Sequence, residues 1–532
     1  MGHSGGATAG LRKWGVLVMI GASIAGLGAI HSATGAGPRT FTFRLQGEPE
    51  TLDWNRAHTT GETYLLMNLM EGLVELDSKL RVVPRLAERY SVSSDGKTYT
   101  FQLRRGVKWQ DGVPLRAADF VYSWKRLLSP LTAAPYAYLL FDVVGAKDFY
   151  DGKNRDFSKV GIRAVNDSTL EVKLQRPIAY WIQIPTFWVT FPLRQDVVEK
   201  HGESWTAPGK MVTLGAYTLA ARELESKVVL QANPSYWDTR RGNVGRVVAQ
   251  IVREDQTALT LFETGGLDFM TEIPSLELKR FSSKPEFRLF PYLKTSYLGF
   301  NVTKFPMSSE RFRRAVAHAI DKRRLVEAVG GIYTPASSFL PKGMAGYDPR
   351  AGLPFDRIRA QSEFRLSGVD TGAAPVRLEL LAYNLDKNRV MAEVIQAQLK
   401  DVLGVAVSVE LYDPKAFRAQ IDLGAYPLWQ GMWGADYPDP DNFMGVFLSN
   451  SGNNRTGWKS ATYDQWVDQA RTMTSVTGRL KLYAQAESLL LQKDAVIVPL
   501  FYEPLPALVS RRSRGIELNP MNYLYLRGVN VD

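Results

Sequence analysis

The residue in this sequence that is best placed to do chemistry is an aspartate, Asp436. It follows an apolar run with two tryptophans, residues 428–434, and precedes a turn with two prolines. A run that ends in small residues is typical of a strand that stops beside open space. A carboxylate in this aromatic, poorly solvated place can bind a cationic group, because ion pairing gains most where water is excluded. The alternative is an aspartate that caps the turn.

Two neighbouring acids, Asp439 and Asp441, raise the question of a metal site. Together with Asp436 they could form a calcium loop, but their spacing misses the EF-hand pattern and two prolines intervene. We therefore expect solvated turn residues here, and no metal site.

Catalytic patterns are missing from the sequence after residue 36. Three histidines remain there, His58, His201 and His318, and they share no pattern. The same part has no His-Glu-x-x-His, no Gly-x-Ser-x-Gly and no phosphate-binding loop. We expect no enzyme, no catalytic residue and no cofactor. A secreted hydrolase that uses remote paired carboxylates is the weaker alternative.

Composition indicates a globular protein of two to four domains. The chain has 532 residues, of which 45% are hydrophobic and 22% charged, and it has no cysteine. Without cysteine there are no disulfides, no thiolate metal sites and no lipidated cysteine. The net charge of +11 is scattered along the chain, whereas a nucleic-acid binder gathers its charge on one surface. We expect no nucleic-acid partner.

The N-terminus has the pattern of a secretory signal peptide. Arg12 and Lys13 precede an apolar run, and small residues follow as far as Ala36. We expect cleavage near residue 36 and a mature protein that is free in an oxidising compartment. A retained membrane anchor is the alternative, although the run is short for a span.

Local patterns predict alternating strands and amphipathic helices along the mature chain. An edge strand is expected at residues 40–45, further strands at 98–104, 169–174 and 227–231, and helices at 64–74 and 117–128. Two more helices at 463–473 and 479–492 and an apolar strand at 495–501 follow near the end. No Gly/Ser-rich linker occurs, so we expect domains joined by short crossing strands, as in hinged proteins.

A strand–helix–strand unit places Asp436 in an α/β domain. Residues 376–382 and 405–411 alternate as strands, and residues 387–403 form the helix between them, which Gly404 ends. Such a unit implies a parallel sheet with a right-handed crossover. The strand at residues 428–434 follows, so Asp436 lies at the carboxyl end of a strand, where ligands of open α/β sheets collect.

Several longer motifs resemble one family. The most specific segments are residues 86–91 and 95–124, and further matches lie at 215–217, 233–238, 300–301, 313–322 and 433–440. Over essentially the whole mature chain, the sequence is similar to the periplasmic oligopeptide-binding proteins, the peptide- and nickel-binding class of solute-binding proteins that serve ABC importers.

The resemblance implies an α/β fold of two hinged lobes with an additional strand-rich domain. Residues 1–36 would be the signal peptide. Lobe I would comprise residues 37–70, 194–294 and 501–532, the strand-rich domain residues 71–193, and lobe III residues 295–500. The protein would be a periplasmic, non-lipidated monomer that binds short peptides by hinge closure and delivers them to an inner-membrane ABC permease.

The resemblance also implies a binding site between the lobes. An extended peptide would pair with a strand on each side, which makes recognition largely independent of side chains. Asp436 would bind the α-ammonium group of the peptide. The other implied site residues are Trp433, Met432 and Gly434 on one lobe, and His58, Thr59, Thr60, Tyr136 and Tyr502 elsewhere in the cleft.

Three positions depart from the family pattern. Gln430 and Ile421 stand where the best-known members carry arginine near the ligand, and Pro414 stands where they carry a cleft tryptophan. Those arginines help to place peptide carboxylates. A longer, modified or less acidic peptide therefore remains an alternative, as does a non-peptide cargo such as an amine, a nickel complex, haem or a sugar.

Overall fold

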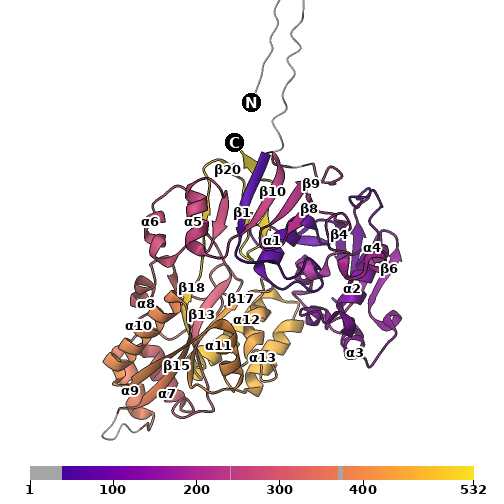
Figure 1. Ribbon diagram of the computed structural model, residues 1–532. Helices are drawn as coiled ribbons and strands as arrows, with labels where there is room; N and C mark the ends of the chain where they lie inside the picture. The colour runs from indigo at the N-terminus through magenta and orange to yellow at the C-terminus, as the bar shows by residue number, and fades with distance from the viewer. Residues whose placement is uncertain (1–38, 240, 370–374) are drawn as a thin grey trace, which may run out of the picture. The chain divides into compact units, whose positions relative to one another are not determined.

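The computed structural model describes residues 39–239, 241–369 and 375–532 (Figure 1). The predicted signal peptide, residues 1–36, lies outside the described residues. Within them, no helix is both long enough and apolar enough to cross a membrane.

A seven-stranded sheet contains the first strand of the described chain. In spatial order its strands are β12 (Phe287–Phe290), β19 (Leu505–Val509), β11 (Phe269–Thr271), β1 (Arg39–Leu45), β10 (Val244–Ile251), β9 (Lys227–Ala232) and β8 (Tyr217–Glu223). The expectation of an edge strand at residues 40–45 is wrong, because β1 pairs in parallel with both β10 and β11. Its polar residue Arg44 is buried, and its guanidinium pairs with Asp255 at 2.7 Å.

A six-stranded sheet contains the predicted strand–helix–strand unit. Its order is β14 (Thr334–Pro335), β18 (Ile497–Tyr502), β13 (Lys294–Phe300), β17 (Leu428–Gly434), β15 (Arg377–Tyr383) and β16 (Ala406–Tyr412). Strands β15 and β16 are parallel, and α10 (Asp386–Leu403) connects them. Gly404 ends this helix at a φ of 70°, a left-handed conformation that glycine adopts without strain. The unit and strand β17 are confirmed.

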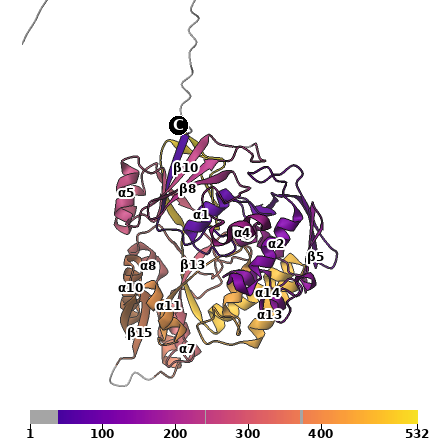
Figure 2. The ribbon, with the colours of Figure 1, turned by 45° about the vertical axis from the view of Figure 1, so that its right-hand side comes forward.

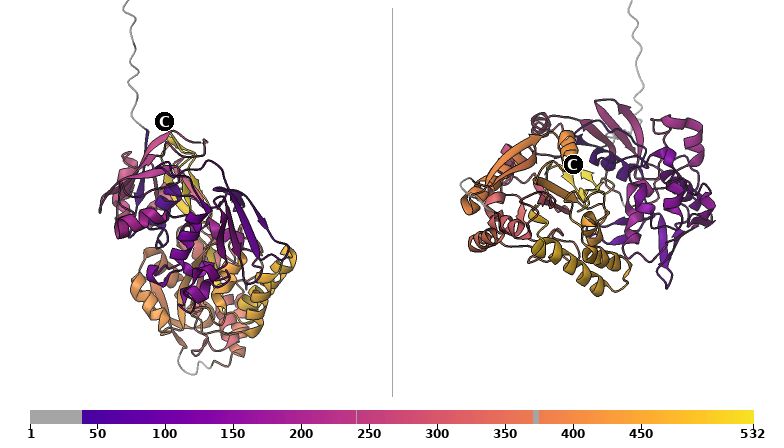
Figure 3. Two further views of the ribbon diagram at one scale, coloured as in Figure 1. Left: turned by 90° about the vertical axis from the view of Figure 1, so that its right-hand side faces the viewer. Right: turned by 90° about the horizontal axis from the view of Figure 1, so that it is seen from below.

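A four-stranded antiparallel sheet lies in the segment predicted to be strand-rich. Its order is β4 (Ala87–Val92), β5 (Thr98–Leu103), β7 (Thr169–Lys173) and β6 (Ile162–Asn166). Helix α2 (Ala117–Leu127) packs on this sheet and contributes the buried Phe120 and Trp124. An ion pair of 2.6 Å between Arg176 and Asp468 connects this part of the chain to helix α13 (Ala461–Thr472). Figures 2 and 3 show the yellow helices near the C-terminal end of the chain beside this purple segment.

The remaining helices and short strands surround these sheets. The helices are α1 (Thr60–Leu69), α3 (Ala146–Tyr150), α4 (Gln195–His201), α5 (Asp255–Glu263), α6 (Leu278–Phe281), α7 (Glu310–Ala319), α8 (Lys322–Ala328), α9 (Arg357–Leu366), α11 (Pro414–Asp422), α12 (Pro440–Met444) and α14 (Val476–Ser488). The short strand pairs are β2 (Val74–Leu76) with β3 (Val82–Pro84), β20 (Ser513–Arg514) with β23 (Asn530–Val531), and β21 (Glu517–Leu518) with β22 (Leu524–Tyr525).

Two short connections pass directly from the seven-stranded sheet to the six-stranded sheet. Residues 291–293 join β12 to β13, and residues 503–504 join β18 to β19. Each connection is short and leads directly from a strand of one sheet into a strand of the other. Residues near them line the site described next.

Candidate ligand-binding site

A cavity of about 310 Å³ lies at the carboxyl end of strand β17. Seven of the nine predicted site residues line it: His58, Thr59, Thr60, Tyr136, Met432, Gly434 and Asp436. These residues come from the N-terminal end of α1, from the segment after α2, and from the end of β17. Three distant parts of the sequence therefore meet in one site.

Asp436 is a carboxylate without a counter-charge. Its Oδ2 accepts hydrogen bonds from the Tyr138 hydroxyl and the Asn442 amide, both at 3.4 Å. Its backbone N–H donates to the Asn442 Oδ1 at 3.1 Å, which fixes the turn. Among the described residues no basic side chain lies within ion-pairing distance of it. Burial raises the pKa of Asp436, and the two hydrogen bonds offset only part of that rise.

The two neighbouring acids are buried and neutralised, so the expectation of solvated turn residues is wrong. Asp439 is 4% exposed and pairs with Arg479 at 2.9 Å, and Asp441 is 1% exposed and pairs with Arg471 at 2.7 Å. Asp439 also accepts the N–H of Asp441 and so caps α12. Within the described residues no group of side chains could hold a metal ion.

The edge of β17 beside Asp436 is open. Strand β13 pairs with β17 along its whole length, whereas β15 pairs only with Leu428 and Trp429. The N–H of Ala435 donates to the Leu293 carbonyl on the β13 side. Backbone direction alternates along a strand, so the polar backbone groups of Met432 and Gly434 face the other, unpaired side. An extended ligand backbone can pair with them there.

The opposite wall is the capped start of helix α1. The Glu62 carboxylate accepts the backbone N–H groups of His58 and Thr59, each at 2.8 Å. The Thr59 hydroxyl accepts the Glu62 N–H in return, which completes a capping box. Helix α1 therefore begins at Thr60, four residues before the predicted start. The box holds residues 58–60 in a fixed extended turn.

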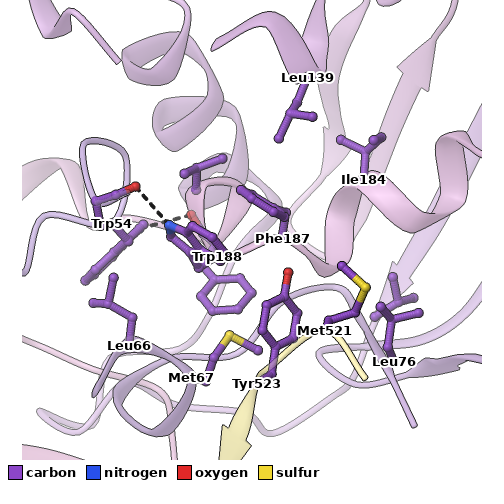
Figure 4. Close-up of a cluster of buried hydrophobic side chains, with 14 of the residues drawn as sticks. Trp54, Leu66, Met67, Leu76, Leu139, Ile184, Phe187, Trp188, Met521 and Tyr523 are labelled. Carbon is purple, nitrogen blue, oxygen red and sulfur yellow. Dashed lines mark hydrogen bonds between the residues drawn. The ribbon is translucent and has the colours of Figure 1, made fainter. Parts of the chain in front are cut away.

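Sequence reasoning missed an aromatic wall. The Phe187 and Trp188 rings stack with centroids 3.8 Å apart, and Tyr136 meets both edge-on (Figure 4 shows Phe187, Trp188 and Tyr523). Tyr523 is 3% exposed, and its hydroxyl has no hydrogen-bond partner among the residues that the structure describes. Burial raises the pKa of Tyr136 and Tyr523, and Asp436 adds to both rises, so both phenols stay neutral. The aromatic run at residues 187–191 was a signal in the sequence, but it has no periodicity that assigns it to a site.

Two predicted site residues do not line the cavity. The Trp433 indole donates to Asn442 Oδ1 at 3.0 Å and so supports the amide that contacts Asp436. Tyr502 is buried, and its hydroxyl donates to the Ser338 carbonyl at 3.0 Å. Gln430, one of the departures from the family pattern, is also buried and donates to the Asn388 carbonyl at 2.8 Å.

The cavity continues into two neighbours, and the three together are called the groove below. A cavity of about 450 Å³ shares Thr59 and Thr60 with it, and a cavity of about 560 Å³ shares Tyr292 and Lys294. These two neighbours share Gln46 and Glu272 with each other. Tyr292 belongs to one of the two connections between the sheets.

Three charged side chains form a cluster in the largest of these cavities. Glu503 Oε2 lies 3.1 Å from Lys294 Nζ and 2.9 Å from Lys387 Nζ. Burial of Glu503 opposes its ionisation, but the two ammonium groups outweigh that effect and lower its pKa to about 2. Two lysines share one carboxylate, so the cluster keeps one positive charge.

Comparisons with known proteins, by sequence and by structure, agree on one family. The model of "Bacterial extracellular solute-binding proteins, family 5 Middle" matches residues 81–455. The chain is 30% identical over 513 residues to the periplasmic oligopeptide-binding protein OppA of Salmonella typhimurium, covering 93% of each chain. It is also 30% identical over 507 residues to the probable deoxycholate-binding periplasmic protein YgiS of Escherichia coli, covering 93% of this chain and 94% of that protein. The unliganded open form of the periplasmic murein tripeptide-binding protein MppA superposes with a TM-score of 0.80 at 28% identity, covering 93% of this chain and 98% of that chain. The predicted fold class, a two-lobed α/β binding protein, is confirmed.

Proposed function

The chain belongs to the family 5 bacterial extracellular solute-binding proteins, and we propose that it binds short peptides by their free amino terminus at Asp436. The observation that carries this proposal is the carboxylate of Asp436, which is desolvated, lacks a counter-charge among the described residues and ends an open strand edge. An α-ammonium group supplies the missing charge, and the peptide backbone supplies the missing strand. The amino-terminal end of a peptide supplies both the positive charge and the extended backbone.

The ligand would lie extended between the edge of β17 and the start of α1. Met432 and Gly434 pair with its backbone on one side, and residues 58–60 contact it on the other. The aromatic wall of Tyr136, Phe187 and Trp188 excludes water from the ion pair. Trp433 acts indirectly, through Asn442, and Tyr502 supports the β18 strand from within the core.

Closure of the groove would occur about the two connections at residues 291–293 and 503–504. Lobe I then comprises residues 37–70, 194–294 and 501–532, lobe III residues 295–500, and the strand-rich domain residues 71–193. A ligand that contacts both walls shifts the equilibrium towards the closed state, because only that state allows both sets of contacts.

The cellular role follows from the family. The protein would be exported by its N-terminal segment, act as a monomer in the periplasm without a lipid anchor, and deliver its cargo to an inner-membrane ABC permease. The family binds solutes and no catalytic pattern occurs after residue 36, so turnover of the cargo is not part of the proposal.

A blocked amino terminus provides the test. Isothermal titration calorimetry would compare tri-alanine with N-acetyl-tri-alanine, which differ in the α-ammonium group alone. We expect the acetylated peptide to bind at least about tenfold more weakly, because it leaves Asp436 without a cation. Equal affinities would reject amine capture. If neither binds, mass spectrometry of small molecules released on denaturing the protein from its own periplasm would identify a non-peptide cargo.

A further inference from the structure

The groove is acidic although the protein is basic. Eight carboxylates and only three basic side chains, those of Arg44, Lys294 and Lys387, line its three cavities. The whole chain carries a formal charge of +11. Five of the eight carboxylates form ion pairs with a lysine or an arginine: Glu48, Asp255, Glu277, Asp386 and Glu503. One ammonium group at Asp436 would therefore leave few carboxylates of the groove without a cation, and these are the ones that matter for a ligand.

Among the described residues, Glu272, like Asp436, is a carboxylate of the groove that forms no ion pair, whereas Glu50 lies 4.0 Å from the His58 imidazole. Glu272 follows the end of strand β11 and lines both cavities that flank the Asp436 cavity. Its carboxylate accepts the hydroxyl of Thr271, and no basic side chain of the described chain forms an ion pair with it. Arg44 lies near, but its guanidinium binds Asp255 at 2.7 Å and the Val252 carbonyl at 2.9 Å.

The placement of Glu272 mirrors that of Asp436. Each acid follows the end of a strand, β11 in the seven-stranded sheet and β17 in the six-stranded sheet, and each faces the groove. Tyr292 lines the cavities of both. Burial raises the pKa of Tyr292, and Asp436 and Glu272 both add to that rise, so both carboxylates act electrostatically on one phenol.

Two buried polar groups independently point to a ligand in the groove. Tyr523 is one of the residues that line the Asp436 cavity, and Asn388 is one of those that line the cavity containing Glu272. Each residue is 3% exposed, and within the described part of the chain neither the Tyr523 hydroxyl nor the Asn388 Oδ1 has a hydrogen-bond partner. A buried polar group without a partner is costly, and almost all such groups in proteins are satisfied. Both oxygens can accept a hydrogen bond, so a ligand rich in N–H donors suits them.

We propose that Glu272 is a second cation site and that the natural cargo presents two cationic groups, one at Asp436 and the other at Glu272. This inference rests on the proposed function for the first group and adds the substrate class. A short peptide with a lysine or arginine side chain has this chemistry, and so does a linear polyamine. A cargo whose only charged group is a carboxylate does not fit the groove.

The test measures binding by calorimetry at low salt. The ligands are tri-alanine, its three single-lysine variants and spermidine. The proteins are the wild type, Glu272→Gln, Asp436→Asn and the control Glu225→Gln. Glu225 is a matched control because its φ of 57° is left-handed like the 52° of Glu272, while its carboxylate pairs with Arg253 at 2.6 Å and does not line the groove.

We expect at least one lysine peptide to bind the wild type about fivefold to tenfold more tightly than tri-alanine. Glu272→Gln removes this advantage and leaves tri-alanine binding unchanged, Asp436→Asn weakens all peptides, and Glu225→Gln changes nothing. If tri-alanine binds but no lysine peptide binds better, or if the advantage survives Glu272→Gln, the second site is rejected while the proposed function stands. If no peptide binds, spermidine decides: binding that both groove variants lose supports two cation sites without peptides, and absence of binding rejects the proposal.

Discussion

The substitution Asp436→Asn tests the central ion pair with little change in shape. Asparagine keeps an oxygen that can accept from Tyr138 or Asn442, and it removes only the charge. Two unit charges 4 Å apart interact with about 4 kcal/mol at an effective dielectric constant of about 20. A solvent-exposed pair retains only about 0–1 kcal/mol. Asp436 is half-buried and desolvated, so we expect a loss of about 2–4 kcal/mol.

This loss corresponds to a rise in the Kd of tri-alanine of about thirtyfold or more at pH 7. Isothermal titration calorimetry measures it directly. The control is Asp401→Asn, which removes an exposed carboxylate whose partner is Arg357 at 2.8 Å, and it should leave the Kd unchanged. A Kd for Asp436→Asn within about threefold of the wild type would refute amine capture at this residue. The substitution removes the charge, so a retained affinity would mean that no desolvated ion pair with this carboxylate contributes to binding.

The same variant should not lose stability. Burial raises the folded-state pKa of Asp436 above its ordinary 3.8. The folded state therefore favours the protonated carboxyl, and the ionised form reduces the free energy of unfolding once the pH exceeds the folded pKa. Asp436→Asn should thus raise the Tm at pH 7, and the gain should shrink as the pH falls through that pKa. A lower Tm at pH 7 would show that the carboxylate serves the fold rather than the ligand.

Three further predictions concern buried carboxylates other than Asp436 and Glu272. Asp441→Ala leaves Arg471 unpaired and should cost about 3–5 kcal/mol in urea unfolding, whereas Asp468→Ala, at the surface, should cost less than about 1 kcal/mol. Burial raises the pKa of Glu487 to about 7, so its stabilising protonated form is lost as the pH rises through 7. Glu487→Gln should therefore raise the Tm more at pH 8 than at pH 5. The lysines lower the pKa of Glu503 to about 2, so its contribution is complete above pH 4.5 and is lost as the pH falls through 2. Glu503→Gln should cost about 3 kcal/mol at pH 7 in urea unfolding.

The first two of these predictions each have a contrary result. Equal costs for the Asp441 and Asp468 variants would mean that burial does not decide the strength of these pairs. A Glu487 variant whose gain is the same at pH 5 and pH 8 would mean that its carboxyl does not titrate between those values. All three hydrogen bonds to Glu487 end on its Oε1, from the Ser338 hydroxyl and two backbone N–H groups, so glutamine can retain them.

Local patterns predicted the parts of the fold whose signals are complete within a short window. The unit of β15, α10 and β16 was predicted because alternation, helical spacing and a terminal glycine all lie within about 35 residues of sequence. Strand β17 and the place of Asp436 beyond it followed from the same kind of evidence. The identity of β1 as an interior strand did not, because the cover for Arg44 comes from Asp255, more than two hundred residues later.

Only part of the lining of the candidate site was predicted from the sequence. Asp436 was singled out from its own surroundings in the sequence, and Met432, Gly434, Tyr136 and residues 58–60 came from the resemblance. Tyr292, Phe187 and Glu272 were not predicted. Each of the missed residues enters the groove because a distant element ends there: a connection between sheets, an irregular aromatic segment and strand β11. The spacing of residues in the sequence does not predict contacts between such distant elements, because these contacts depend on how whole sheets pack.

Of the three aspartates that follow β17, only Asp436 has no arginine partner among the described residues. Asp439 and Asp441 follow it within five residues, yet each is neutralised by an arginine of the later helices, Arg479 in α14 and Arg471 in α13. These pairs fix the turn in place, so the loop is held by charge pairs that a ligand cannot reach. Asp436 lies on the groove side of the same turn and receives only hydrogen bonds from neutral groups.

If a third arginine reached this carboxylate, the loop would gain a further ion pair and lose its affinity for cations. Placing one arginine near Asp436, by Tyr138→Arg, should therefore abolish peptide binding without unfolding the protein, and a variant that still bound tri-alanine would show that the ligand's charge is held elsewhere.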